Sequence, residues 1–449
     1  MIETQLNQAM KETGPFAEQF KTLDAPSGQP SWLLPLRKGG MACFAELGFP
    51  TSALEDWRFT SLAPLIKLPF RSAPMDGAGL NISAIEQFHF TQIPGSRLVF
   101  VNGRIAKELS TITALPDGVI VSSLADALIS NAALVEKHLG RYVKTENNAL
   151  AALNTALFED GGFIHVPAGK NVTEPIHLLF VTTAKDSGVT VQPRNLIIAE
   201  ANSAVTVIES HVTTNKGAYF SNSVTELFAG DNAKLEHIKF QDEALEAFHV
   251  ATVQGRFLRG SQVSTHSFAL GARLSRINLR TKLDGEGIEA ILNGLYITRG
   301  EQLADHHMIV EHAQPRCASH EYFNGILDDK SKGVFHGRIL VHPIAQKTDA
   351  KQTNKNILLS DDATADTKPQ LEIYADDVKC THGATIGQMD PDSIFYLRAR
   401  GIGLERAKRM LVHSFAGEII ARVKCQAVRE ELDKVAWDRL EQNPRLSDQ

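Results

Sequence analysis

Four segments in the middle of the chain begin with a small or polar turn and run into a strand: NSAVTVIE (202–209), NAKLEHIK (232–239), GSQVSTHS (260–267) and GEGIEAIL (285–292). Their first large apolar residues are Val205, Leu235, Val263 and Ile288, so the segments recur at steps of 30, 28 and 25 residues. A strand-only repeat of this length is typical of a β-solenoid, in which each coil buries its apolar face against the next. The spacing therefore predicts a solenoid.

A β-sandwich with regularly spaced hairpins is the alternative fold for the same region. Hairpins favour two-residue connections of the Asn-Gly or Asp-Gly type. Between residues 202 and 292 the only such pair is Asp284-Gly285. The solenoid is therefore the favoured interpretation.

The patterns on either side of the solenoid are mainly helical. Residues 1–160 read as a mostly helical domain with a small hairpin at RLVFVNGRIA (97–106), where Asn102-Gly103 separates two apolar runs. After Asp390-Pro391, which has the form of an N-cap followed by proline, residues 391–449 show helices with apolar stripes. The predicted fold class is mainly β, with a right-handed parallel β-helix core at 161–390. The C-terminal helices are expected to cap its open end or to form a docking surface.

The composition excludes several classes of function. The 449 residues include 46 Lys and Arg against 52 Asp and Glu, a net charge of −6, so no nucleic-acid partner is expected. The start MIETQLNQAM has no basic region followed by an apolar run, and no segment approaches the roughly 18–20 apolar residues of a membrane span. The expected localisation is cytoplasmic, without a membrane partner. Four scattered cysteines are too few for a disulfide framework.

Nucleotide-binding motifs are absent from the sequence. Gly169-Lys170 is followed by Asn171 instead of Ser or Thr, and the spacing before it does not fit a P-loop. The GIG at 401–403 lacks the third glycine of a dinucleotide fingerprint. ATP hydrolysis by this chain is therefore not expected.

A histidine-rich run, DHHMIVEHAQPRCASH (305–320), is the first candidate metal site. On a strand, His306 and His307 point to opposite faces, so the potential ligands do not all converge. The spacing matches no standard zinc pattern. We therefore expect exposed strand histidines and a loop instead of a metal site, for the following candidates: His306, His307, His312, Cys317 and His320.

The string DDVKCTHGAT (376–385) is the second candidate. Cys380 and His382 are two positions apart, so on a strand both side chains point the same way, about 7 Å apart. A thiolate and an imidazole suit zinc or iron–sulfur chemistry, but two ligands cannot hold a metal alone. Other ligands would have to come from elsewhere, including another subunit. Taken alone, the pattern favours a buried structural thiol beside an exposed histidine.

The run KGVFHGRILVHPIAQKTDAKQTNKNILLSDDATADTKPQLEIYADDVKCTHGATIGQMD (332–390) resembles the SufB/SufD family of iron–sulfur cluster assembly proteins. The resemblance continues upstream through DHHMIVEHAQPRC and EDWRFTSLAPL, and so covers most of the chain. It is stronger to the SufD branch, since SufB members carry further cysteines in the β-helix. This β-helix region has only Cys317 and Cys380.

The resemblance implies a non-catalytic scaffold subunit. It implies pairing with a SufB-type sister subunit through the β-helices and docking of a SufC-type ABC ATPase through the C-terminal helices. The family's nascent cluster lies at the subunit interface, so the metal-ligand residues implied here are His382 and its neighbour Cys380. The iron–sulfur cluster would be transient and shared with SufB, and none would bind tightly to the isolated chain.

Two other interpretations stay open. One is a cytoplasmic β-helix enzyme that acts on a polymer or acyl group through His306 and His307 or through acidic residues. The sequence favours solvated turn acids for the pairs Asp328-Asp329, Asp361-Asp362 and Asp376-Asp377. The other is a homodimer formed through the β-helix edge that would otherwise meet SufB.

Overall fold

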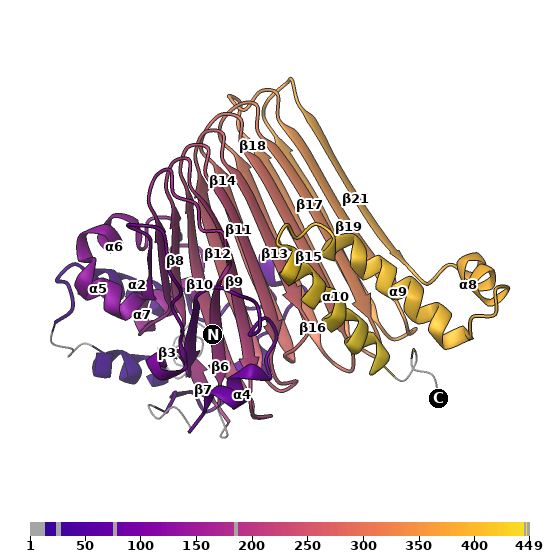
Figure 1. The fold of residues 1–449 in the computed structure, drawn as a ribbon, viewed down its shortest axis with the longest axis horizontal. Coiled ribbons are helices and arrows are strands. Elements are labelled where there is room, and N and C mark those ends of the chain that lie inside the picture. The colour runs from indigo at the N-terminus through magenta and orange to yellow at the C-terminus, as the bar shows by residue number, and fades with distance from the viewer. Residues whose placement is uncertain (1–13, 24–27, 75–78, 184–186, 444–445, 447–449) are drawn as a thin grey trace.

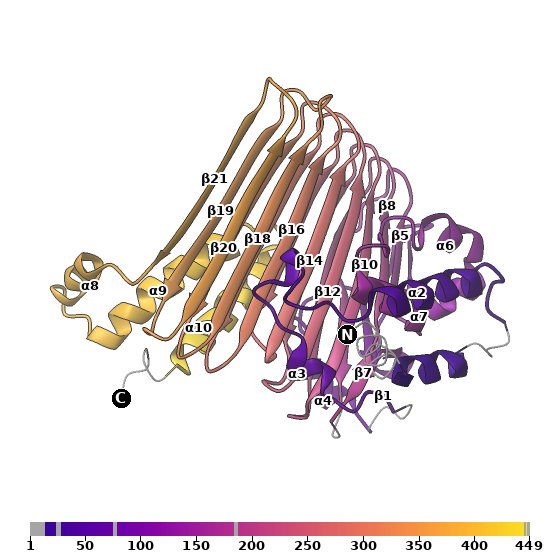
Figure 2. The same ribbon diagram turned by 180° about the vertical axis from the view of Figure 1, so that it is seen from behind.

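The computed structural model describes residues 14–23, 28–74, 79–183, 187–443 and 446. Its main body is a two-sheet parallel β-solenoid of about eight turns, with helices at both ends of the sequence (Figures 1 and 2). The predicted solenoid is confirmed. Among the described residues, no helix is both long enough and apolar enough to cross a membrane.

From β8 onward, successive strands alternate between the two sheets. Sheet A contains β1 (Arg71–Ser72), β4 (Ile120–Ser123), β5 (Gly162–Val166), β7 (Val189–Val191), β8 (Arg194–Ala199), β10 (Tyr219–Ala229), β12 (Phe248–Phe257), β14 (Leu274–Leu283), β16 (Leu303–His312), β18 (Lys332–Val341) and β20 (Thr364–Ile373). Sheet B contains β2 (Arg97–Val101), β3 (Arg104–Ile105), β6 (Ile176–Thr182), β9 (Ala204–Thr213), β11 (Lys234–Asp242), β13 (Gln262–Ala269), β15 (Glu289–Thr298), β17 (Ala318–Leu327), β19 (Asp349–Leu358) and β21 (Lys379–Gly387). The hairpin predicted at 97–106 is the antiparallel pair β2–β3.

The turn residues set the repeat. Asn202, Asn232, Gly260 and Gly287 have φ values of 57°, 57°, 66° and 71°, a left-handed conformation that Asn and Gly adopt most readily. Each stands three residues before an inward-facing strand position. Counted between these four turn residues, the successive coils are therefore 30, 28 and 27 residues long.

Register shows one error in the predicted repeat. Val205 pairs with Leu235, and Leu235 with Val263, as predicted. Val263 then pairs with Ala290, because Ile288 lies in the turn before β15 and is fully buried there. Beyond Ala290 the same inward column continues through Ser319 and Ala350 and ends at Cys380.

Helices cover part of the outer face of each sheet. The described helices are residues 14–23, α2 (Leu33–Leu47), α3 (Ala63–Ile66), α4 (Ile82–Glu86), α5 (Leu124–Ser130), α6 (Ala132–His138), α7 (Ala149–Leu157), α8 (Pro391–Arg398), α9 (Leu404–Ile420) and α10 (Gln426–Glu441), with short 3-10 turns η1 (Glu55–Trp57) and η2 (Lys107–Leu109). Asp390 caps α8 as predicted, its carboxylate accepting from the N–H groups of Asp392 and Ser393.

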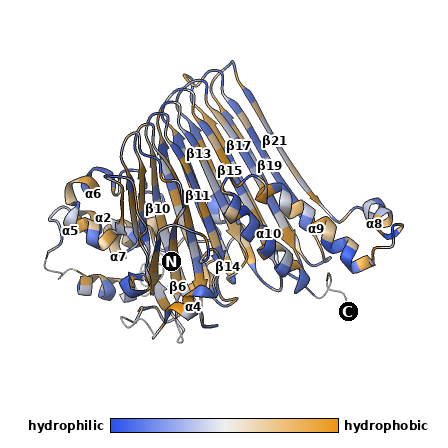
Figure 3. Cartoon of the chain, viewed as in Figure 1, coloured by the Kyte–Doolittle hydropathy of each residue, from blue (hydrophilic) through white to orange (hydrophobic). Residues whose placement is uncertain are grey.

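The C-terminal helices lie along the solenoid instead of across its end (Figure 1). Apolar residues of α9 and α10 pack on outward residues of sheet B such as Ile238 and Phe268. Hydrophobic and hydrophilic residues mix along the strands, consistent with two covered sheet faces (Figure 3). The open end at β20 and β21 is left uncovered by these helices, and the proposed domain division at residues 160 and 390 stays a prediction.

Candidate functional site at the open end of the solenoid

Cys380 and His382 lie on β21, the last strand of sheet B, which among the described strands pairs with β19 alone. Their Cα partners on β19 are Ala350 and Gln352, so both side chains continue inward-facing columns of the solenoid. Cys380 is half-buried and packs on an apolar cluster that includes Ala350, whereas His382 is exposed. The structure thus brings the two predicted residues to one face of an edge strand.

The thiol of Cys380 is not ionised to the thiolate that binds metals. Burial raises its pKa, and the nearby carboxylate of Asp349 raises it further, while a hydrogen bond with the backbone of Ala350 lowers it. The protonated thiol is therefore favoured at neutral pH. His382 is the more accessible donor of the pair.

The edge around these residues is apolar as well as unpaired. Ile373, Tyr374 and Ile386 are exposed by 37%, 63% and 46% at the end of the solenoid. An edge strand with free backbone groups and exposed apolar side chains is a surface on which another chain can pair.

Polar residues line the interior directly behind β21. The side chains of Gln352, Asn354 and Asn356 on β19 face inward, and Gln352 Nε2 donates to Glu321 Oε2 at 2.5 Å. Burial raises the pKa of Glu321 to about 8, so this acid is neutral at pH 7.

The structure corrects the prediction made for the histidine-rich run. His306 and His307 do point to opposite faces of β16, as predicted, and so form no convergent enzyme site. However, His306, His307 and His312 are buried, with exposed fractions of 1%, 6% and 0%. They are not exposed strand histidines, because His306 and His312 face the interior of the solenoid and Asp56 lies over His307 on the outer face.

The other two residues of this run, Cys317 and His320, differ in burial. Cys317 is buried, its Sγ 3.1 Å from the carbonyl oxygen of Gly285, and burial raises its pKa. His320 is half-buried on sheet B. Among the predicted turn acids, Asp328 is buried instead of solvated, since Asn443 Nδ2 donates to its carboxylate at 2.8 Å.

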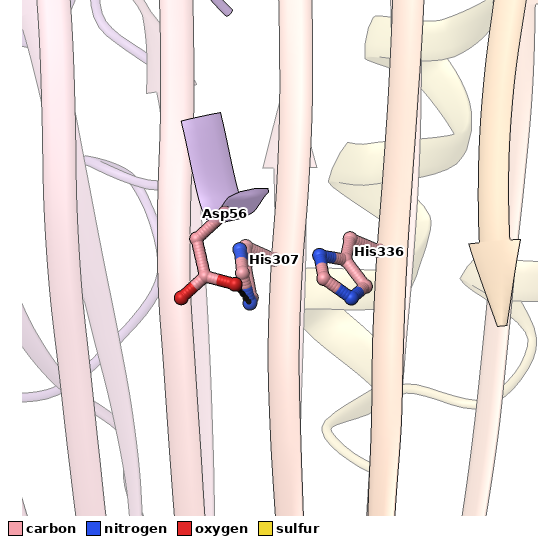
Figure 4. Close-up of side chains that lie close together, drawn as sticks. All are labelled: Asp56, His307 and His336. Carbon is pink, nitrogen blue, oxygen red and sulfur yellow. Dashed lines mark ion pairs between the residues drawn. The ribbon is translucent and has the colours of Figure 1, made fainter. Parts of the chain in front are cut away.

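A cluster that the sequence did not reveal lies on the outer face of sheet A. Asp56, His307 and His336 approach one another, with potential ligand atoms all within 4.8 Å (Figure 4). His307 and His336 are register partners on β16 and β18, and Asp56 lies over them from the N-terminal region. The two histidines are 29 residues apart, which is the length of one coil. This spacing was the one sign in the sequence that they would lie side by side.

Hydrogen bonding in this cluster disfavours a metal. Arg276 Nη2 donates to His307 Nδ1 at 2.9 Å, so the neutral ring carries its proton on Nε2. That Nε2 is the atom that faces Asp56, 3.8 Å away. Burial and the neighbouring Arg276 hold the pKa of His307 well below its usual range. A metal ion bound to His307 would have to displace the Nε2 proton, and it would lie close to the positive charge of Arg276. We therefore interpret the cluster as a structural contact.

Two family models match the chain in succession. The model described as the SufBD protein N-terminal region matches residues 14–178. The model described as SUF system FeS cluster assembly, SufBD core domain, matches residues 180–415, more than half of the chain. The chain belongs to the SufBD family. It is a SufD-like iron–sulfur cluster assembly protein, as the relatives also indicate.

Relatives of the SufBD family match along most of their length. An iron–sulfur cluster assembly SufBD family protein of Synechocystis is 35% identical over 90% of both chains. SufD of Escherichia coli is 33% identical over 86% of this chain and 88% of its own, and SufD of Bacillus subtilis is 26% identical over 93% and 96%.

The SufBD N-terminal region sends one segment along the solenoid, which we call the N-terminal strap (residues 55–60; Figure 2). The Trp57 ring lies 3.8 Å from the Arg276 guanidinium on β14, and Thr60 Oγ1 donates to Asp305 Oδ2 on β16 at 2.5 Å. Glu55 forms an ion pair with Lys368 on β20. The strap therefore reaches the final coil of sheet A, next to the open end.

Proposed function

We propose that this SufBD-family chain is a SufD-type, non-catalytic subunit of an ATP-driven assembly complex, which pairs with a SufB-type sister subunit through the open end of the solenoid. His382 would supply a ligand to a nascent iron–sulfur cluster at that interface, with Cys380 as its neighbour. The observation that carries this proposal is the exposed His382 on an edge strand that pairs with no described strand on its outer side. A single imidazole and a protonated thiol cannot hold a cluster alone, so the other ligands would come from the sister subunit.

A first test replaces the ligand. The His382→Ala variant, co-expressed with SufB- and SufC-type partners, is expected to form the complex but to lose at least tenfold in cluster assembly, followed by cluster absorbance. His342→Ala, which removes a part-exposed histidine just beyond β18, is the matched control and should assemble clusters normally. Wild-type assembly by His382→Ala would exclude the ligand role.

Docking of a SufC-type ATPase would use α8. None of the residues of α8 is buried, and Phe395 and Tyr396 are exposed by 73% and 56% (Figure 1). The helix projects beyond α9, and exposed aromatic residues of this kind are typical of binding hot spots.

A second test changes this helix alone. Phe395→Asp is expected to weaken ATPase binding at least tenfold in a pull-down, while leaving the thermal unfolding of the chain unchanged, because the side chain is exposed. Ile129→Asp, on the equally exposed apolar residue of α5, is the control and should bind normally. Equal ATPase capture by Phe395→Asp would place the docking surface elsewhere.

A homodimer is the second candidate assembly in the absence of a sister subunit. The same unpaired β21 edge and its exposed Ile386 would pair with a second copy. Light scattering on the purified chain distinguishes a dimer from a monomer.

A further inference from the structure

One buried hydrogen-bond acceptor is left open behind His382. The inward amides of Asn354 and Asn356 are engaged with each other and with Tyr296 Oη and the Phe323 carbonyl. Gln352 differs from them, because its Nε2 donates to Glu321 while its Oε1 has no hydrogen-bond partner among the described residues. Glu321 Oε1 is unpaired as well, and the neutral acid can donate its proton to one lone pair of Gln352 Oε1, which leaves the second lone pair of this oxygen open. Buried carbonyl oxygens are nearly always paired, since leaving one unpaired is costly.

The register places the residue that carries this oxygen next to the candidate ligand. Gln352 and His382 are Cα partners on β19 and β21, in the same inward column. Adjacent strands lie about 4.8 Å apart, a distance that a glutamine amide and an imidazole can bridge. Within the described β19 strand, no other inward carboxamide has an unpaired oxygen.

The opposite sheet makes room for the amide and limits its movement. A Cβ on Gly337 would lie 2.3 Å from Gln352 Nε2 and 2.7 Å from Cδ, so only glycine allows the side chain to rest there. On its other side the Gln352 amide is held by the carboxyl group of Glu321. The amide is therefore fixed at both faces before His382 meets any ligand.

We propose that Gln352 is a positioning residue for His382: its Oε1 accepts the N–H of the imidazole, fixes the tautomer and directs the other ring nitrogen to the subunit interface. This inference rests on the proposed ligand role of His382. Histidine ligands commonly donate their second N–H to a carboxylate or carbonyl oxygen in this way, which orients the ring and makes it more basic.

The test measures the tautomer of His382 in the full chain. With nitrogen-15-labelled histidine, long-range NMR correlations distinguish Nδ1–H from Nε2–H, and the signal that His382→Ala removes identifies His382. Gln352→Met keeps the length of the side chain but lacks the acceptor. It is expected to change the tautomer ratio about fivefold, the effect of one net hydrogen bond. Gln352→Glu restores an acceptor and should restore the ratio.

Asn354→Leu is the matched control on the same strand, because its hydrogen bonds go to Tyr296 and Phe323. It is expected to lower stability, because it removes these buried hydrogen bonds, and to leave the His382 tautomer unchanged. If Gln352→Met does not fold, Gly337→Ala provides a second route, since its Cβ displaces the same amide.

The second readout is cluster assembly by the co-expressed complex, which should fall about tenfold in Gln352→Met while the complex still forms. An unchanged tautomer ratio in Gln352→Met and Gly337→Ala would overturn the inference and leave the proposed function intact. Normal assembly by His382→Ala would overturn the proposed function, whereas the tautomer measurement would still decide whether Gln352 holds the ring.

Discussion

Lowering the pH from 7 to 5 is expected to reduce the free energy of unfolding by at least about 5 kcal/mol. Most of the effect comes from five buried histidines with pKa values lowered by burial to about 3 or 4: His138, His177, His211, His306 and His312. Burial also lowers the pKa of His266 and His307, which adds to the loss. Their unfolded-state pKa is about 6.5, so below that pH the unfolded chain binds protons that the folded chain does not. Each histidine then costs about 2 kcal/mol at pH 5.

Two buried acids act in the opposite direction. Burial raises the pKa of Glu321 to about 8 and that of Asp160 to about 6, so the folded chain takes up their protons first as the pH falls. Together they offset about 4 of the roughly 9 kcal/mol lost through the five histidines, which leaves a net loss of at least about 5 kcal/mol. Urea unfolding at pH 7, 6 and 5 measures this difference.

A single substitution serves as the control for this prediction. His306 contacts no acidic group; its Nε2 lies 3.1 Å from Ser267 Oγ and its ring stacks on Tyr296. His306→Gln should therefore reduce the pH dependence by about 2 kcal/mol. Equal stability of the wild-type chain at pH 7 and pH 5 would contradict the burial of these histidines in neutral form.

Replacing Lys239 by Met is expected to cost about 4 kcal/mol of stability at pH 7, because it leaves a buried carboxylate without its cation. Lys239 Nζ lies 2.6 Å from Glu209 Oε1, and both side chains are almost fully buried inside the solenoid. Burial alone would raise the pKa of Glu209, but Lys239, His211 and His237 outweigh it and hold that pKa well below its usual range. Denaturant unfolding of Lys239→Met measures the cost.

The double variant Glu209→Gln/Lys239→Met separates charge from packing. It removes both charges and keeps an amide oxygen for the neighbouring donors His237 and Thr225. We expect it to recover at least half of the loss. A double variant less stable than Lys239→Met would mean that the ion pair contributes little and that packing dominates.

The solenoid was predictable because its repeat depends on local chemistry. Asn202, Asn232 and Gly260 stand at turns that require positive φ, so the sequence must place small or polar residues there. Ile288 misled the prediction because a buried apolar residue at a turn looks like the start of a strand. Only the register, with Ala290 opposite Val263, shows the difference.

The candidate site was predictable in part. Two-residue periodicity placed Cys380 and His382 on one face of a strand, and the structure agrees. The same periodicity could not show that His307 is buried, since burial there comes from a distant part of the chain. Nor could it find Gln352, which becomes relevant only when neighbouring coils are placed in register.

The N-terminal strap has a consequence for the order in which the molecule folds. Most solenoid contacts join neighbouring coils, about one repeat apart in sequence, and can form as each coil leaves the ribosome. The contact between Glu55 and Lys368 joins residues 313 positions apart. The strap is synthesised early, but its contact with β20 can form only after most of the chain has been synthesised. The strap therefore completes its packing late in folding.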